Sequence, residues 1–248
     1  MLGCEPMSHA AGSPIGVMTL HGFTGTPASL RQIADAMVDA TFDVELPLLP
    51  GHGTTVDDML GTRWEDWVEE VERAYQRLAA RTDHVVLVAQ SMGATLILET
   101  ALRHRSVAGL VCINPLTQIR DADTMAMLDE FIEDGMTVVP GGDQSDIADP
   151  NASDTSYSGT PLVPLRSLMY EGVAAITDRF GELTMALLVL TSRQDHVVDP
   201  ADSVHLVDTW GGPVEHTWLE RSYHVATLDY DRDQVTAEAV GFVRRVAG

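Results

Sequence analysis

A serine between a buried strand and a helix is the feature that most constrains the fold of this chain. The apolar run 84–89 predicts the strand, and the pattern over 92–102 predicts the helix. Between them stands Ser91, in the pentapeptide Ala-Gln-Ser-Met-Gly. A strand-to-helix turn this tight needs small residues two positions away on each side, which the alanine and the glycine supply. We interpret Ser91 as the nucleophile of a nucleophile elbow, although a serine near a glycine also occurs in ordinary turns.

Length, charge and cysteine content restrict the class of protein. A chain of 248 residues with 45% apolar residues predicts one large domain with a sizeable core. Its formal net charge of −22 argues against binding to nucleic acids and against adsorption to anionic membranes. Cys4 and Cys112 suggest neither a disulfide framework nor a metal cluster, and no apolar run has the length of a membrane span. We expect a cytoplasmic protein that needs no cofactor and no metal.

Strand and helix signals alternate along most of the chain. Strands are predicted at 15–20, 42–46, 84–89, 107–113, 185–191 and 214–219. Helices are predicted from Thr26-Pro27, over 63–81 and 92–102, near 201–209 and over 232–246. This alternation predicts an α/β fold, with a mostly parallel sheet flanked by helices. The start of the chain, including His9, and the segment 47–61 are expected to lack regular structure.

Residues 116–180 interrupt this alternation. We therefore predict a core formed by 1–115 and 181–248, with 116–180 inserted as a helical lid. The insertion has a Met-rich amphipathic stretch, a loop rich in Gly, Asp and Ser at 141–160, and a helix candidate at 165–180. We expect it to line an apolar pocket at the carboxyl edge of the sheet, although a subdomain packed only for stability would show the same pattern. Its apolar side chains should face the pocket (Met125, Leu128, Phe131, Ile132, Met136). Its acidic side chains should face solvent (Asp121, Asp123, Asp129, Glu130, Glu133, Asp134).

A serine nucleophile needs a base, and the base is usually a histidine oriented by a carboxylate. Asp195 follows the predicted strand 185–191, and His224 follows the predicted strand 214–219. Both positions lie at the strand ends where open parallel sheets place active residues. The chain order of serine, acid and histidine is that of elbow-type enzymes. We predict that Ser91, Asp195 and His224 form a catalytic triad.

Other acids and histidines compete for these roles. Asp199 and Asp202 flank Pro200 and are expected to be carboxylates at the start of a helix. His196 is expected on a loop near the pocket rim, and His52 near the site, in a place that does not suit a general base. Four further histidines fall on or beside regular elements and are expected to be surface or packing residues (His84, His104, His205, His216).

A tetrahedral intermediate needs hydrogen-bond donors for its oxyanion. The amide of Met92 directly follows the nucleophile, and the amide of Phe23 lies in the glycine-rich loop after strand 15–20. We expect these two amides to be the donors, although a glycine-rich turn without a catalytic role would look the same. Five residues are expected to contact the substrate (Gly22, His52, Ile119, Met125, Val197).

Six segments together resemble one known family. They read His-Gly-Phe-Thr-Gly-Thr-Pro at 21–27, Gly-His-Gly-Thr at 51–54, Asp-Trp-Val at 66–68, Ser-Met-Gly at 91–93, Asp-His-Val-Val at 195–198 and Ser-Tyr-His-Val-Ala-Thr-Leu-Asp at 222–229. With them the chain resembles the α/β-hydrolases, in particular the bacterial monoacylglycerol lipases and related carboxylesterases. The resemblance implies Ser91 as nucleophile, Asp195 as acid, His224 as base, Phe23 and Met92 as oxyanion donors, and a cap between two core segments.

The chain departs from the family pattern at two places. Ala89 replaces the first glycine of the G-x-S-x-G motif, a difference of one methyl group. The sequence Tyr-Ser-Gly-Thr-Pro at 157–161 stands against a Tyr-Glu-x-Thr-Pro pattern of the monoacylglycerol lipases. If that glutamate selects the glycerol head, Ser158 puts a strict preference for monoglycerides in doubt.

We expect a serine ester hydrolase that cleaves neutral carboxylic esters with medium to long acyl chains through an acyl-enzyme. A thioesterase or a C–C bond hydrolase would use the same triad, and a haloperoxidase activity would be a side reaction of the same site. A non-catalytic module that binds a small apolar ligand is a further alternative, but such modules typically lose one triad member. The expected partner is an ester or lipid substrate. The sequence leaves open whether the lid also makes transient contact with lipid surfaces. Acyl length, alcohol group and oligomeric state are also left open.

Overall fold

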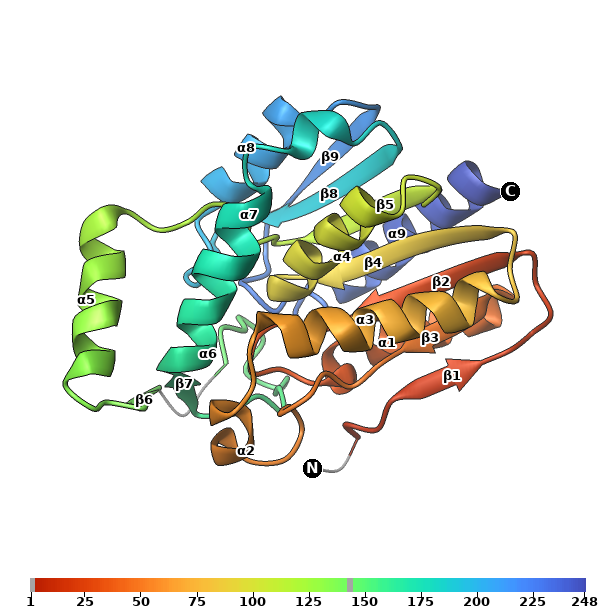
Figure 1. Ribbon diagram of the computed structural model, residues 1–248. Coiled ribbons are helices and arrows are strands. Elements are labelled where there is room, and N and C mark those ends of the chain that lie inside the picture. Colours follow the sequence, from red (N-terminus) through yellow and green to blue (C-terminus); the bar gives the residue numbers. More distant parts are fainter. Residues whose placement is uncertain (1–2, 142–144) are drawn as a thin grey trace.

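The computed structural model describes residues 3–141 and 145–248, and a seven-stranded sheet forms its centre (Figure 1). The strands lie in the order β1-β3-β2-β4-β5-β8-β9. Their bounds are β1 Met7–His9, β2 Ile15–Leu20, β3 Asp43–Leu46, β4 His84–Gln90, β5 Gly109–Ile113, β8 Ala186–Ser192 and β9 Val214–Leu219. All neighbours pair in parallel except β1, which pairs antiparallel with β3. The predicted α/β class with a mostly parallel sheet is confirmed.

Helices cover both faces of the sheet. On one face pack α1 (Arg31–Asp39) and α9 (Arg232–Ala247). On the other face pack α3 (Trp64–Ala79), α4 (Met92–Arg103) and α8 (Ala201–Thr209). Successive residues of β4 face opposite sides, so Val86 and Val88 join the core under α1 and α9, and Leu87 joins the core under α3 and α4. Because both sides are covered, the central strands are continuously apolar, which is why the sequence revealed them.

Two short elements lie where the sequence predicts irregular structure. The prediction for His9 is wrong, because this residue ends β1. Polar contacts hold this strand and the loop after it. The Ser8 hydroxyl donates to Glu45 at 2.6 Å, and the amides of Ala11 and Ser13 donate to the buried carboxylate of Asp43, at 2.9 and 3.0 Å. Such contacts leave no hydrophobic periodicity in the sequence. Likewise, α2 (Val56–Leu60) lies within the predicted loop 47–61, and its start is capped by the Thr55 side chain.

The insertion between β5 and β8 contains helices and a small hairpin. Its elements are α5 Ala122–Glu133, β6 Val138–Pro140, β7 Gly159–Pro161, α6 Leu162–Ser167, a π-helical turn Leu168–Val173 and α7 Ala174–Ile176. In Figure 1, α5 stands at the outer end of the molecule, and α6 and α7 lie between it and the sheet. The helix predicted at 165–180 in fact begins at Leu162 and ends at Ile176, because Pro164 is tolerated in a first helical turn. Part of the predicted loop 141–160, residues 142–144, lies outside the described residues.

The prediction for Asp202 as a helix-start carboxylate is incomplete, because this side chain holds the start of the insertion. One oxygen accepts hydrogen bonds from the amides of Thr117 and Gln118, at 2.8 and 3.1 Å. The other pairs with Arg120 at 3.2 Å, and the carboxylate is buried. Asp199 has the predicted role, since it accepts from the Ala201 amide at 2.9 Å.

We predict that Asp202→Ala strongly destabilises the protein. The substitution leaves two amides and a guanidinium without their acceptor, so the free energy of unfolding should fall by about 2–4 kcal/mol. The matched control, Asp199→Ala, removes one exposed cap and should cost only about 1 kcal/mol. Urea denaturation followed by circular dichroism measures both values. Equal losses in the two variants would contradict the anchoring role of Asp202.

Candidate active site

Ser91 lies in a strained turn between β4 and α4. Its backbone has φ 55° and ψ −125°, a left-handed conformation that favours glycine. The neighbouring elements hold it there, because the Ser91 amide donates to the Ile113 carbonyl at 3.0 Å and the Ser91 carbonyl accepts from the Ala94 amide at 2.9 Å. This conformation presents the side chain at the carboxyl edge of the sheet, as the elbow motif predicts.

Two glycines make the turn possible. A Cβ atom on Gly93 would lie 2.6 Å from the carbonyl oxygens of both Leu20 and His21, so no larger residue fits there. A Cβ atom on Gly22 would lie 3.0 Å from the Cβ of Ser91. The loop after β2 therefore packs directly against Ser91.

Asp195 and His224 come together as predicted. The Nδ1 atom of His224 lies 2.7 Å from Oδ2 of Asp195, and both side chains are nearly buried. The other carboxylate oxygen accepts from the amides of Val197 and Val198, at 2.9 and 2.8 Å. These bonds leave Oδ2 directed at the imidazole, which fixes Nδ1 as the protonated ring nitrogen and leaves Nε2 as an acceptor.

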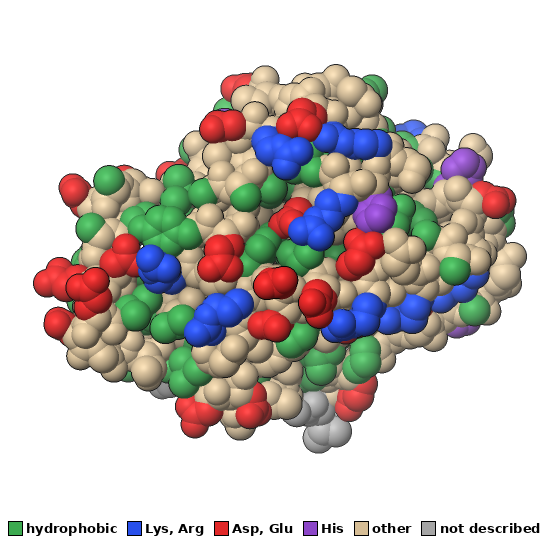
Figure 2. Space-filling model, viewed as in Figure 1, with side chains coloured by type: hydrophobic (Ala, Val, Ile, Leu, Met, Phe, Trp, Pro, Cys, Tyr) green, Lys and Arg blue, Asp and Glu red, His purple; other side chains and the backbone are tan. Residues whose placement is uncertain are grey.

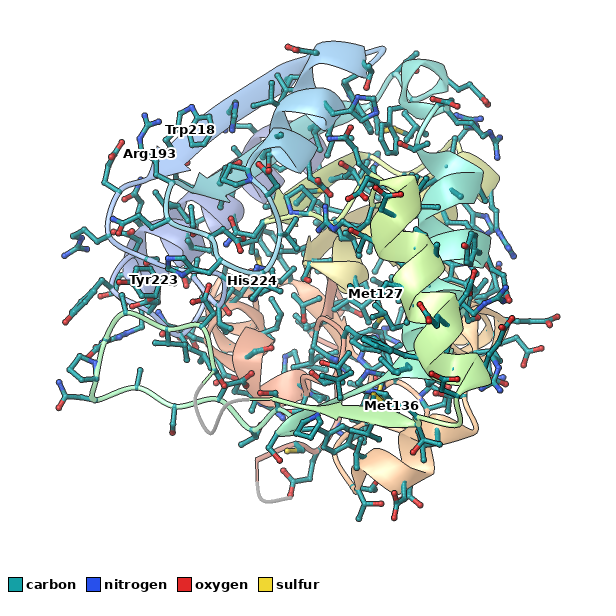
Figure 3. All side chains as sticks on the ribbon, turned by 90° about the vertical axis from the view of Figure 1, so that its left-hand side faces the viewer. Met127, Met136, Arg193, Trp218, Tyr223 and His224 are labelled. Atoms are coloured by element: carbon teal, nitrogen blue, oxygen red, sulfur yellow. The ribbon has the colours of Figure 1, made fainter. Side chains whose placement is uncertain are left out.

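Ser91 and His224 border the same cavity, which has a volume of about 700 Å³. One part of its wall is apolar and comes mainly from the insertion (Leu116, Met125, Leu128, Phe131, Leu162, Leu165, Leu168, Met169). Another part is polar and comes from 145–158 (Ser145, Asp146, Asp154, Ser156, Tyr157, Ser158). Figure 3 shows His224 on one side of the opening and Met127, from α5, on the other. The cavity therefore offers an amphipathic ligand an apolar region and a polar region.

Two of the five predicted substrate contacts, Met125 and Val197, line this cavity. The other three do not belong to its lining. Gly22 lies behind Ser91, and His52 is 1% exposed among other rings. Ile119 is 36% exposed, because the chain before it is drawn toward Asp202. These three residues therefore do not belong to the cavity lining, and their contact with a substrate stays a prediction.

The helix α5 has the predicted amphipathic character. Met125 and Leu128 are buried and Phe131 lines the cavity, but Met136 lies beyond the end of the helix and is exposed. Five of the six predicted acidic residues are exposed, and acidic side chains gather over α5 in Figure 2. Asp129 differs, because it pairs with Arg166 at 2.6 Å and accepts from the Tyr170 hydroxyl at 3.0 Å. This pair links α5 to the helical segment that follows β7.

Aromatic rings support the loop that carries Phe23. The Phe23 ring meets Trp67 edge-on at 5.9 Å, Trp67 meets His52 at 5.8 Å, and His52 lies 5.0 Å from His21. The Nε2 atom of His21 accepts from the Leu49 amide at 3.3 Å. Burial lowers the pKa of His21 to about 3 and that of His52 to about 4. Both rings are therefore neutral packing residues, which agrees with the expectation that His52 is no general base.

Sequence reasoning missed three residues that hold the His224 backbone. The side-chain amides of Gln90 and Asn114 donate to the His224 carbonyl, at 3.2 and 2.8 Å. The Asp146 carboxylate accepts from the His224 amide at 3.0 Å. A polar residue directly after the strand 107–113 was a usable signal for Asn114. Asp146 had no such signal, because it lies in a loop full of Gly, Asp and Ser.

The competing histidines contact other side chains. His196 follows Asp195 on the loop after β8, where its ring lies 2.8 Å from Asp146 and meets the Tyr223 ring edge-on. His104 pairs with Glu72, and His205 is near Thr177. Within residues 3–141 and 145–248, no group of three or more His, Cys, Asp or Glu could hold a metal ion. In the same residues, no helix has both the length and the apolar character needed to cross a membrane.

We predict that His52 contributes to acid sensitivity. The unfolded chain binds a proton at this ring near pH 6.5, but the folded chain does so only near pH 4, so stability is lost as the pH falls through this window. His52→Asn keeps a donor for the Pro50 carbonyl but has no titrating ring. Its free energy of unfolding should fall less steeply between pH 6.5 and 4.5, by up to about 1.4 kcal/mol per pH unit. Urea titrations at several pH values measure how steeply the free energy of unfolding changes with pH. His84→Asn, at an exposed histidine, is the control. If His52→Asn shows the same pH dependence as the parent protein, the prediction is contradicted.

Comparisons with known proteins agree with this geometry. The family model described as "Serine aminopeptidase, S33" matches residues 15–231. The chain is 34% identical to a thermostable monoacylglycerol lipase of Bacillus sp. (strain H-257), over 99% of this chain and 96% of that protein. It is 22% identical to a carboxylesterase of Bacillus subtilis (strain 168), over 95% of this chain and 94% of that protein.

Solved structures show the same fold. A structure described with the metagenome-derived lipolytic enzymes LipS and LipT superposes with a TM-score of 0.91 at 33% identity, over 99% of both chains. The monoacylglycerol lipase of Paleococcus ferrophilus superposes with a TM-score of 0.72 at 14% identity, over 92% of this chain and 93% of that chain, which speaks for the fold alone. The chain therefore belongs to the serine aminopeptidase S33 family and has the α/β-hydrolase fold.

Proposed function

We propose that this protein is a serine ester hydrolase that cleaves neutral carboxylic esters with medium to long acyl chains. The observation that carries the proposal is the bond of 2.7 Å between His224 and Asp195, together with a strained Ser91 that borders the same cavity. In the proposed triad, the imidazole accepts the proton of the serine hydroxyl and so activates it as a nucleophile. The relatives named as monoacylglycerol lipase and carboxylesterase support the same reaction class.

In the proposed mechanism, Ser91 attacks the ester carbonyl while Nε2 of His224 accepts its proton. Asp195 orients the imidazole and stabilises its charged form. His224 then protonates the leaving alcohol, and a water molecule activated by the same ring releases the acid from the acyl-enzyme. The amides of Phe23 and Met92 stabilise the oxyanion. Met92 is suited to this because it is the first residue of α4, where backbone N–H groups have no acceptor within the helix.

The cavity supports a neutral, amphipathic substrate. Its apolar wall, between α5 and the π-helical turn, fits an acyl chain, and its polar wall fits the alcohol part. Asp146 and Asp154 add carboxylates to this polar wall, and burial raises the pKa of Asp154. Ser158 lines the cavity where the monoacylglycerol lipase pattern has a glutamate. We therefore propose a tolerance for several alcohols rather than a strict preference for monoglycerides.

The alternatives differ in measurable ways. A thioesterase or a C–C bond hydrolase would use the same triad on another substrate, and the family description adds aminoacyl amides as a class to test. Competition between a monoglyceride, a short-chain ester, an acyl-thioester and an aminoacyl anilide separates these enzymes. A non-catalytic binding module would leave Ser91 inert toward a fluorophosphonate probe.

We predict that Ser91→Ala abolishes turnover of p-nitrophenyl esters, with a loss of about 10⁴-fold or more in kcat. The hydroxyl does not stabilise the fold, so the thermal unfolding midpoint should stay close to that of the parent. A fluorophosphonate should label the parent at Ser91 and leave the variant unlabelled. Ser106→Ala, at an exposed serine that does not belong to the cavity lining, is the control. Parent-level turnover by a folded Ser91→Ala protein would end the proposal.

We predict weak binding to anionic lipid vesicles. The net charge of −22 and the exposed acidic residues of α5 repel such surfaces, whereas the exposed side chains of Met127 and Val197 at the cavity mouth can touch neutral lipid. Flotation with phosphatidylcholine vesicles should recover more protein than flotation with phosphatidylglycerol vesicles. Met127→Ser should lower the recovery with neutral vesicles. Tight binding to anionic vesicles that survives high salt would contradict the prediction.

A further inference from the structure

A carboxylate of the insertion lies against both loops that carry the proposed acid and base. Oδ2 of Asp146 accepts from the backbone amides of His224 and His196, at 3.0 and 3.1 Å. Oδ1 of Asp146 lies 2.8 Å from Nδ1 of His196. The Asp146 carbonyl also accepts from the Val225 amide at 3.1 Å. Because His196 directly follows Asp195 in the chain, one side chain connects the loop after β8 with the loop after β9.

His224 is thereby held at three different groups. Its imidazole is bound by Asp195, and its carbonyl accepts from Gln90 and Asn114. Its amide is bound by Asp146. The first three partners belong to the hydrolase core, whereas the fourth comes from the insertion. Without Asp146, the His224 amide loses its acceptor, and the orientation of the preceding peptide is no longer fixed. The imidazole of His224 can then shift away from the position from which it acts on Ser91 in the proposed mechanism.

The segment that carries Asp146 is itself fastened to the core. The amides of Ala148 and Asp149 donate to the buried carboxylate of Asp229, at 2.7 and 2.9 Å. Further along, the Tyr157 hydroxyl donates to the Gly51 carbonyl at 2.7 Å. These contacts place the carboxylate of Asp146 at a defined position, where it is only 17% exposed. A segment without these contacts to the core could not hold the Asp146 carboxylate in one position.

The negative charge of Asp146 strengthens its contacts with both loops. Its Oδ2 atom accepts from two backbone amides, and hydrogen bonds to a charged acceptor are roughly twice as strong as those between neutral groups. An asparagine keeps one acceptor oxygen for these amides but carries no charge, and its NH₂ group then faces Nδ1 of His196. Exchange of Asp146 for Asn therefore weakens the contacts without a change in side-chain volume.

We propose that Asp146 is a positioning residue that clamps the loops of Asp195 and His224, so that the insertion completes the catalytic site in addition to lining the cavity. The proposal rests on the proposed function of Ser91, Asp195 and His224. It has a consequence that cavity lining alone does not have. Esters too small to reach the apolar wall of the insertion depend on Asp146 as much as long-chain esters do.

The test is Asp146→Asn, assayed with p-nitrophenyl acetate and with a long-chain p-nitrophenyl ester. Misplacement of a catalytic group by about 1 Å costs about 10²-fold in rate, so we expect kcat to fall by about 10- to 100-fold for both esters, with KM changed by less than about threefold. Labelling of Ser91 by a small fluorophosphonate should slow by a similar factor. A residue that only shapes the cavity would change the long-chain ester alone.

Three further variants sharpen the test. Asp149→Asn makes the same charge change on a neighbouring carboxylate that pairs with Arg232, and it should keep the parent kcat. His196→Ala removes a ring but keeps the backbone amide, and it should cost less than about threefold, well below the loss from Asp146→Asn. Asp146→Glu keeps the charge but displaces both oxygens by one methylene, so a smaller loss of about three- to tenfold is expected. This variant carries the test if Asp146→Asn does not fold.

The parent kcat on p-nitrophenyl acetate in a folded Asp146→Asn or Asp146→Glu protein overturns the proposal, as does a loss confined to the long-chain ester. Circular dichroism and the thermal midpoint establish that each variant is folded. The proposed function is tested separately by Ser91→Ala. Full activity of Asp146→Asn together with an inactive Ser91→Ala would contradict the positioning role of Asp146. It would leave the proposed ester hydrolase function unaffected.

Discussion

The left-handed backbone of Ser91 is the constraint on which the rest of the site depends. A strained residue persists only where the surrounding structure over-determines it. Here β4 pairs with β2 on one side and with β5 on the other, and Gly93 brings the start of α4 against the carbonyls of Leu20 and His21. The buried strands thus hold a conformation that the serine alone would not adopt. The loop after β2, with Phe23, packs against Ser91 through the close approach of Gly22.

Hydrogen bonds from several parts of the chain hold His224, the proposed base. Core residues hold its ring and its carbonyl, and Asp146 of the insertion holds its amide. The insertion also provides most of the apolar wall of the cavity. The wall of the cavity and the support of the proposed base therefore share one segment of chain. The same segment places Asp146 and Asp154 on the polar wall.

The predictions that held concern local pattern and topology. Continuous apolar runs predicted the central strands, because strands covered on both faces are apolar throughout. Asp195 and His224 meet because β8 and β9 are neighbouring parallel strands that end at the same edge of the sheet, and their roles as acid and base stay a prediction. Contacts over long distances in the chain were not predicted. Ile119 lies outside the cavity because Asp202, more than 80 residues away, draws the preceding amides to itself.

The sequence by itself determined the sheet, the elbow and the candidate acid and base, because these depend on periodicity, on small residues beside a turn, and on chain order. Only the tertiary structure decided how the insertion meets the core. Asp146 and Asp202 each accept from two backbone amides, and a backbone amide carries no signature in the residue type that provides it. A polar residue in a loop of polar residues reveals its partner only when the chain is folded.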